Sequence, residues 1–340
     1  MTATGLPFDD IRALFPLLPP ASQSCVADVR ERDRELVKPP HSLGRMEELV
    51  EWLAAWQGRS RPAITRPLVA IFAASHGVAD QRVSVSPQTA TRAMMETYAA
   101  GGGAINQICA TYELGLKVFD LALDIPTGDL TQGPAFDEAG CAATIAFGME
   151  AIAGGADLLC LGEIGTGATT VAAAICFALY GGRAADWAGG GGEIDAATHA
   201  RKIAAVETAV DLHRPHLADP LELLRRLGGR DVAAIAGAIL AARMERVPVI
   251  LDGYVVTAAA AVLHAIMPAS IDHCLAAHVS AEPGHAEALR RIGKKPLLDL
   301  GIRLGEGAGA ALAAGLLKAA LACHLEMATF SQAQGSVMPG

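Results

Sequence analysis

Aromatic residues are scarce in this chain: they make up 4% of its 340 residues, and charged residues make up only 19%. Hydrophobic residues reach 52%, which is typical of a globular protein and excludes a disordered one. With so few rings, the core must be built from Ala, Val, Leu and Ile, whose small side chains favour close packing of helices. The length admits one large α/β domain, or one such domain with a smaller companion.

A basic surface is also missing. The formal net charge is −9, and Lys and Arg form no stripe along the chain. This distribution argues against nucleic acid as the main partner. The stretch from Met1 to Asp10 contains no basic segment followed by an apolar one, so we expect no signal peptide.

Two runs without Asp, Glu, Lys or Arg approach the length of a membrane-spanning helix, namely Ile164 to Gly182 and Gly253 to Ile271. The first run begins with a Gly/Thr turn, and the second contains His264 and Pro268. We therefore expect both to be buried helices of a protein that has no membrane span and a cytoplasmic location.

The seven cysteines include no Cys-x-x-Cys pair, and most of them lie in apolar runs. They are Cys25, Cys109, Cys141, Cys160, Cys176, Cys274 and Cys323. Buried free thiols in a reducing compartment explain this pattern better than a zinc site does. The sequence predicts no metal and no cofactor.

From residue 68 onward, short apolar runs alternate with helical patterns. The expected strands are Leu68 to Ala74, Lys117 to Asp124, Asp157 to Leu161, Val247 to Leu251 and Ile271 to Val279. This alternation predicts a three-layer α/β/α fold with a mainly parallel, Rossmann-like sheet. We expect residues 61–283 to form this large domain, which carries the substrate pocket, and residues 1–60 and 284–340 to form a small helical lobe.

The segment from Lys38 to Arg45 must be extended, because Pro39 and Pro40 cannot continue a helix. Two interpretations stay open for it. It is either an ordinary linker between helices with solvated charges, or an arm that reaches a neighbouring site.

A single carboxylate, Glu306, stands between Gly305 and Gly307, ahead of an Ala/Leu helix expected from Ala308 to Met327. The glycines permit turn geometry and leave the carboxylate unscreened. An enclosed carboxylate of this kind can serve as a general base, because enclosure raises its pKa. The alternative is a carboxylate that merely favours the N-terminal end of the helix dipole.

The run from Gly162 to Thr170 predicts a strand end, a glycine-rich turn and the start of a helix. Such a turn offers main-chain N–H groups to an anion. The glycine spacing resembles a P-loop, but Ala168 stands where the lysine would be, so a monophosphate fits better than a triphosphate. The alternative is a tight turn that Thr169 caps.

Four further features of the sequence each allow a functional interpretation and an ordinary structural one. The run from Gly189 to Gly192 permits close approach of a ligand, or is a low-complexity loop. Lys202, on an expected helix, would ordinarily be solvated surface. His76 follows the first strand and is either a ligand contact or a hydrogen-bonded loop residue, and Ser280 is either a pocket hydroxyl or a helix cap.

Taken together, these segments resemble one family, the nicotinate-nucleotide–dimethylbenzimidazole phosphoribosyltransferases of cobalamin nucleotide-loop assembly. Each matching segment is short, but their order along the chain is specific. The segments are Lys38-Pro39-Pro40, Ser42-Leu43-Gly44-Arg45, His76-Gly77-Val78, Ser86-Pro87, Gly162-Glu163-Ile164-Gly165, Thr169-Thr170, Arg201-Lys202, Gly228-Gly229, Leu251-Asp252-Gly253, His278, Ser280-Ala281-Glu282, Arg303-Leu304-Gly305-Glu306-Gly307 and Gly309-Ala310-Ala311.

The resemblance implies a reaction and a set of roles. Nicotinate mononucleotide would give its phosphoribosyl group to 5,6-dimethylbenzimidazole, and the products would be nicotinate and α-ribazole 5′-phosphate. Glu306 would be the general base. The implied contacts with the aromatic base are Ser86, Met94, Ile164 and Leu304. The implied contacts with the sugar, the phosphate or nicotinate are Glu163, Gly165, Thr169, Thr170, Lys202, Ser280 and Gly305.

Three positions depart from the family pattern: Ser75 replaces an Asp, Ala168 an Asn, and Met94 a Gln that can face the base. These changes bear on the choice of base more than on the type of reaction. A paralogue that activates adenine, a phenol or another benzimidazole therefore stays an alternative. So does a protein that binds mononucleotides or bases without turnover. The resemblance also implies a homodimer.

Overall fold

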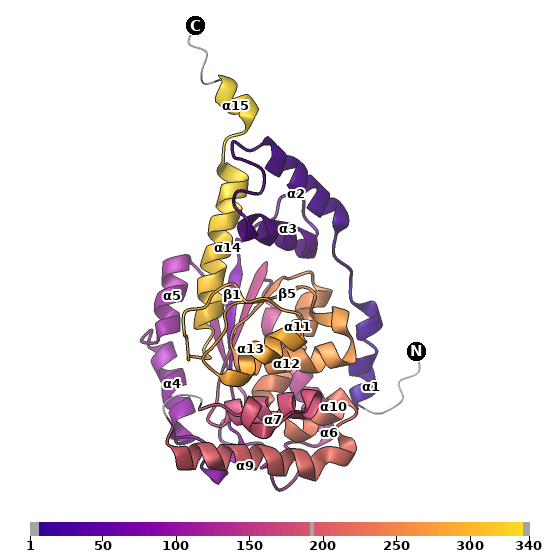
Figure 1. The fold of residues 1–340 in the computed structure, drawn as a ribbon, viewed down its shortest axis with the longest axis vertical. Helices are drawn as coiled ribbons and strands as arrows, with labels where there is room; N and C mark the ends of the chain where they lie inside the picture. Colours follow the sequence, from indigo (N-terminus) through magenta and orange to yellow (C-terminus); the bar gives the residue numbers. More distant parts are fainter. Residues whose placement is uncertain (1–6, 191–193, 336–340) are drawn as a thin grey trace.

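The computed structural model describes residues 7–190 and 194–335. Five parallel strands form one sheet in the order β2-β1-β3-β4-β5, and helices lie on both sides of it (Figure 1). The strands are β1 (Pro67–Ala73), β2 (Gly115–Asp120), β3 (Leu158–Ile164), β4 (Val249–Leu251) and β5 (Cys274–Ala276). The predicted three-layer α/β/α fold with a parallel sheet is confirmed. This order is doubly wound: β2, the next strand in the chain, pairs with one side of β1, and β3 pairs with the other side.

Helices occupy most of the remaining chain. The α-helices are α1 (Pro7–Arg12), α2 (Gln23–Glu35), α3 (Arg45–Gln57), α4 (Thr89–Ala99), α5 (Ala104–Tyr112), α6 (Glu138–Met149), α7 (Ala168–Tyr180), α8 (Ala184–Trp187), α9 (Ala196–His213), α10 (Pro220–Leu227), α11 (Arg230–Met244), α12 (Tyr254–Ile266), α13 (Pro283–Arg291), α14 (Ala308–Glu326) and α15 (Phe330–Gly335). The 3₁₀ helices are η1 (Phe15–Leu17), η2 (Gly77–Gln81), η3 (Glu150–Ile152), η4 (Arg214–His216) and η5 (Pro268–Ile271).

The two faces of the sheet contact different helices, because side chains alternate along each strand. On one face, Phe72 and Leu161 belong to the core that α6, α7, α11 and α12 share. On the other face, Ile71 and Cys160 belong to a second core with α3, α5 and α14. Both cores are rich in alanine, as the low aromatic content predicts. All seven cysteines are free thiols and six are buried, while Cys323 is half-buried.

Helix α14 is long and apolar enough to cross a bilayer by length and composition, and 56% of its most apolar stretch is buried inside the protein. It packs against β3, α3 and α5, so its apolar surface is used within the fold. The two runs that the sequence singles out form the shorter helices α7 and α12.

The terminal segments do not all gather in one place. Helices α2 and α3 pack together, and α3 packs against α14, at the end of the molecule where α15 lies (Figure 1). Helix α1 packs against α6, and α13 packs against α12 and α8. The division into a large domain at 61–283 and a small helical lobe stays a prediction.

The segment after α2 is anchored by buried charges. The Lys38 ammonium lies 2.7 Å from Asp33 and 2.7 Å from Glu47, and its side chain is 5% exposed. Arg45 donates hydrogen bonds to the main-chain oxygens of Pro296 (2.6 Å) and Lys295 (3.2 Å). Lys38 is therefore not solvated, and Arg45 ties α3 to the loop that leads to Glu306.

Every predicted strand differs from the observed one at an end, and two of them stop three or more residues before the predicted C-terminal end. The strand expected at Lys117 to Asp124 ends at Asp120, because Ala122 adopts a φ of 58° and the Asp120 carboxylate accepts from the Leu123 N–H. The strand expected at Ile271 to Val279 is reduced to β5, because its first residue closes η5 and its end forms only a single bridge between His278 and Leu298.

Candidate active site

Two adjoining cavities open beyond the carboxyl end of β3, the central strand of the sheet. This is the edge at which doubly wound sheets bind ligands. Together with the solvent space at their mouths, the larger has a volume of about 1120 Å³ and the smaller about 740 Å³. Both are lined by Glu163, Thr169, Gly190, Arg303, Leu304 and Gly305. One ligand can therefore extend from one cavity into the other.

One wall of the larger cavity is mostly apolar, as contact with an aromatic ring requires. Helix α4 turns Thr91, Met94 and Tyr98 toward it, since positions three and four apart share a helix face. The wall also includes Val83, Val85, Ser86, Ile164 and Leu304. The structure thus brings together all four residues predicted to contact the aromatic base, although they come from separate parts of the chain.

Glu306 also lines the larger cavity, and it is only 3% exposed. Gly307, which follows it, has a φ of 85°, a conformation that glycine adopts without strain. The Tyr98 hydroxyl donates a hydrogen bond to Glu306 Oε2. Burial raises the pKa of Glu306, the Tyr98 hydrogen bond lowers it, and the nearby Asp252 carboxylate raises it again. The net result is a carboxylate with increased affinity for a proton, as a general base requires.

The N-terminus of α14 is occupied by a different carboxylate. Asp252, at the carboxyl end of β4, accepts from the main-chain N–H of Gly307 (3.1 Å) and of Ala310 (2.9 Å). His278 Nε2 lies 3.5 Å from Asp252 Oδ1. Because Asp252 satisfies these amides, stabilising the helix end does not account for Glu306, and the general-base interpretation is the stronger one.

Glu163 stands at the junction of the two cavities, 7% exposed, with its main-chain N–H bonded to Gly305 O at 2.9 Å. Its Oε2 is buried and has no partner among the described residues. Burial raises the pKa of Glu163 well above its usual range, and the charges of Asp231 and Asp252 add to this. A protonated carboxyl group at this position can donate a hydrogen bond to a ligand.

The turn before α7 contributes Gly165 to the larger cavity, and the first turn of α7 contributes Thr169, beside Lys202 of α9. Lys202 is not solvated surface: it is 1% exposed and donates to Thr169 Oγ1 (2.9 Å) and Gly189 O (2.8 Å). Burial lowers the pKa of Lys202, and the Glu282 carboxylate opposes this. Thr170 is buried and lines neither cavity.

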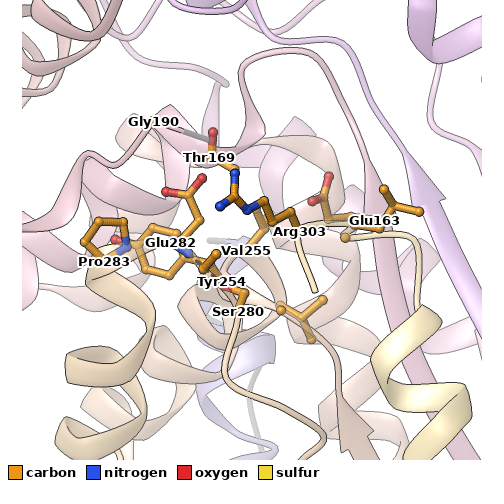
Figure 2. Close-up of a pocket in the computed structure, with 14 residues that line it drawn as sticks. Glu163, Thr169, Gly190, Tyr254, Val255, Ser280, Glu282, Pro283 and Arg303 are labelled. Carbon is orange, nitrogen blue, oxygen red and sulfur yellow. Dashed lines mark hydrogen bonds between the residues drawn. The ribbon is translucent and has the colours of Figure 1, made fainter. Parts of the chain in front are cut away.

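The smaller cavity is formed at the N-terminal end of α12 by Gly253 and Tyr254, with Ser280, Glu282 and Pro283 opposite. Figure 2 shows the Arg303 guanidinium reaching between Glu282 and Glu163. A helix N-terminus, a hydroxyl and a guanidinium together favour an anion. Of the run from Gly189 to Gly192, Gly190 lines both cavities, and Gly191 and Gly192 lie outside the described residues.

A neutral histidine holds Ser280. The Ser280 N–H donates to His285 Nδ1 at 2.9 Å, and His285 Nε2 lies 3.0 Å from Thr257 Oγ1. Burial lowers the pKa of His285 to about 3, with the charge of His278 adding to this, so its Nδ1 is free to accept. Ser280 is therefore fixed beside the smaller cavity.

His76 does not line either cavity. It is 1% exposed, and its Nε2 lies 3.1 Å from Asp231 Oδ2 beneath the glycine turn, where a Cβ on Gly165 would come within 2.8 Å of it. His76 thus supports the turn. Among the described residues, no group of three or more His, Cys, Asp or Glu side chains is arranged to hold a metal ion.

Tyr98, Asp252 and Arg303 are site residues to which the sequence patterns assign no role. Tyr98 follows Met94 by four residues, which places both on one face of a helix. Asp252 directly follows an apolar run, where a strand end carries polar groups toward the ligand edge. Arg303 offered no such local signal, because it lies in an irregular loop.

Comparison with known proteins agrees with this geometry. A family model described as phosphoribosyltransferase matches residues 18–334. The nicotinate-nucleotide–dimethylbenzimidazole phosphoribosyltransferase of Rhizobium rhizogenes is 64% identical over 333 residues, covering 98% of each chain. The protein of that name from Methylocella silvestris is 63% identical over 334 residues, again covering 98% of each.

The crystal structure of the protein of that name from Thermus thermophilus is also similar. It gives a TM-score of 0.84 at 38% identity, covering 94% of this chain and 100% of that one. The family predicted from the sequence is confirmed: this chain belongs to the nicotinate-nucleotide–dimethylbenzimidazole phosphoribosyltransferases.

Proposed function

We propose that this protein transfers the phosphoribosyl group of nicotinate mononucleotide to 5,6-dimethylbenzimidazole, releasing nicotinate and α-ribazole 5′-phosphate. The observation that carries the proposal is the position of Glu306. Its buried carboxylate lines the larger cavity, which has an apolar wall on one side and groups that favour an anion on the other. A base that deprotonates an azole and a site that grips a sugar phosphate are what this reaction needs.

The aromatic base lies in the larger cavity, against Ser86, Met94, Ile164 and Leu304. One ring nitrogen directs its N–H toward the Glu306 carboxylate, which removes the proton. The electron pair of the other ring nitrogen then attacks C1′ of the ribose and inverts that carbon. The bond from C1′ to the nicotinate nitrogen breaks, and its electron pair neutralises the cationic pyridinium ring. Nicotinate therefore leaves without help from an acid.

The phosphoribosyl group lies at the junction of the cavities. Glu163 and Gly305 stand beside the sugar, and the protonated Glu163 carboxyl donates to a ribose hydroxyl. Nicotinate mononucleotide has two anionic groups, its phosphate and its carboxylate. The N-terminal ends of α7 and α12 bind these two groups. Residues at the first end are Gly165, Thr169 and Lys202, with Thr170 buried behind them, and Ser280 serves the second end.

The decisive experiment mixes purified protein with both substrates and measures nicotinate release and α-ribazole phosphate by mass spectrometry. We expect turnover in the native protein, and a rate about two to four powers of ten lower in Glu306→Gln, as is typical of a lost general base. Stoichiometric binding without product would mean a binding protein instead. A Glu306→Gln variant with full activity would show that the base has been misassigned.

The identity of the aromatic base is tested in the same assay. Met94 lines the cavity at the position where the family pattern has a Gln. The wall therefore has no side-chain amide at this position that could form hydrogen bonds with polar groups on the ring. We expect dimethylbenzimidazole to be preferred over adenine and phenol in a mixture of the three. Preferential use of adenine or a phenol would identify a paralogue.

We also propose that the protein is a cytoplasmic homodimer. Family membership supports the dimer, and buried free thiols suit a reducing compartment. Light scattering would then give twice the chain mass of 35.0 kDa. A mass equal to one chain would contradict it.

A further inference from the structure

Tyr98 is placed where it can control the general base. It lies on the face of α4 that lines the larger cavity, one turn after Met94, and is 3% exposed. Its hydroxyl donates to Glu306 Oε2. Among the described residues, this is the only hydrogen bond to the Glu306 side chain. Glu306 Oε1 accepts no hydrogen bond from the described residues, so it is available to a ligand in the larger cavity.

This single bond matters because the usual sources of stabilisation are used elsewhere. A carboxylate beside a helix N-terminus would normally accept from the first main-chain amides. Here Asp252 accepts from Gly307 and Ala310, so those amides do not serve Glu306. Burial and the charge of Asp252 both disfavour the ionised form of Glu306. Tyr98 supplies the one hydrogen bond that favours it.

We propose that Tyr98 is a positioning residue for the proton-transfer step, holding Glu306 Oε2 so that Oε1 is ionised and directed at the N–H of the aromatic base. This inference rests on the proposed function. In the step, the base loses its proton to Oε1, and Tyr98 keeps its own proton throughout. Burial and the Glu306 carboxylate raise the pKa of Tyr98 far above neutral, so the hydroxyl acts only as a donor.

The test is Tyr98→Phe, which removes one oxygen and keeps the ring that packs against Gly103. We expect the acid limb of the pH profile of kcat/KM to move upward by about one pH unit, because a hydrogen bond to a charged group is lost. We expect kcat to fall about threefold to tenfold at the pH optimum, with an unchanged KM for nicotinate mononucleotide.

The matched control is Tyr112→Phe, the same chemical change on α5, where the side chain lies outside both cavities. We expect its pH profile to be native. A second variant, with 3-fluorotyrosine at position 98, keeps ring and hydroxyl but donates more strongly, so the limb should move downward. This variant covers the case in which Tyr98→Phe fails to fold.

The midpoint of the acid limb decides the outcome. If Tyr98→Phe has the native midpoint, the proposal is overturned, even if its kcat is lower. If Tyr98→Phe does not fold, a native midpoint in the fluorotyrosine variant overturns the proposal instead. Failure of the proposed function looks different, because the native protein would then release no nicotinate before any variant is made.

Discussion

Gly162 of β3 contacts Gly307 main chain to main chain, so closely that a Cβ on Gly162 would lie 2.4 Å from the Gly307 nitrogen. The same Cβ would lie 2.8 Å from the Glu306 carbonyl carbon. Because both partners in this contact are backbone, no side chain can rotate to make room. The central strand therefore sets the position of the turn that carries the general base.

We predict that Gly162→Ala displaces this turn. The methyl group cannot be accommodated without moving Glu306, so we expect a loss of about 1–3 kcal/mol in the free energy of unfolding. We expect kcat to fall by at least tenfold, because a small misplacement of a reacting group is costly. Urea unfolding and the nicotinate-release assay measure the two effects.

Gly133→Ala is the control, because a Cβ at that position meets nothing within 4 Å. We expect native stability within about 0.5 kcal/mol and native kcat. If Gly162→Ala were as active as Gly133→Ala, the strand would not determine the position of Glu306.

Local patterns in the sequence predicted the parts of the site that depend on local geometry. The glycines around Glu306 indicate a turn, and the alternation of apolar runs indicates a parallel sheet. The cavity wall is different, because Met94 and Leu304 are far apart in the chain and no periodicity links them. Their assignment came from family resemblance alone.

Burial of polar groups could not be predicted. A lysine on a helix is ordinarily solvated, and only the tertiary contacts of Lys202 with Thr169 and Gly189 make its burial possible. In the same way, Asp252 competes with Glu306 for the α14 amides only after β4 and α14 have packed together. Strand β4 itself is three residues long, too short for a period to define its ends.

We predict that Asp252→Asn moves the acid limb of kcat/KM downward, opposite to Tyr98→Phe. Glu306 must be ionised to accept a proton, and the Asp252 charge raises its pKa. Without that charge the pKa falls, and activity persists to lower pH. The new amide accepts from only one of the two main-chain N–H groups, so we also expect a loss of about 1–3 kcal/mol in stability.

A pH profile of kcat/KM and urea unfolding check these two effects. The control is Asp211→Asn, because Asp211 is exposed and pairs with Arg214. We expect this change to alter neither the acid limb of kcat/KM nor the free energy of unfolding. An upward movement of the limb in Asp252→Asn would show that its charge does not act on Glu306.

We predict that Glu163→Gln is more stable than the native protein at pH 8 and less active. The folded-state pKa of Glu163 is raised above its ordinary value of 4.5, so the folded state holds a proton that the unfolded chain releases. Stability therefore falls as pH rises from about 4.5 through the raised pKa. A glutamine does not ionise and avoids this loss, which we expect to give about 0.5–2 kcal/mol.

Urea unfolding at pH 4 and pH 8 measures the difference. At pH 4 both folded and unfolded native chains are largely protonated at this position, so the advantage should disappear. If Glu163→Gln were more stable than the native protein by the same amount at pH 4 and at pH 8, the cause would be packing and not ionisation. Activity at pH 8 should fall, because the glutamine NH2 group is a weaker hydrogen-bond donor to the sugar than the O–H of a protonated carboxyl group.

Thr169 and Thr170 are neighbours with different surroundings, and we predict different effects of replacing them by valine. Thr169 Oγ1 accepts from Lys202 and lines both cavities, whereas Thr170 Oγ1 is buried with no partner among the described residues. We expect Thr169→Val to raise the KM for nicotinate mononucleotide about tenfold, since a hydrogen bond that orients a cation is lost. Thr170→Val should keep the native KM and gain up to about 1 kcal/mol in stability, because it removes an unsatisfied hydroxyl. Steady-state kinetics and urea unfolding of the pair test this, and a raised KM in Thr170→Val would show that this hydroxyl also serves the phosphate.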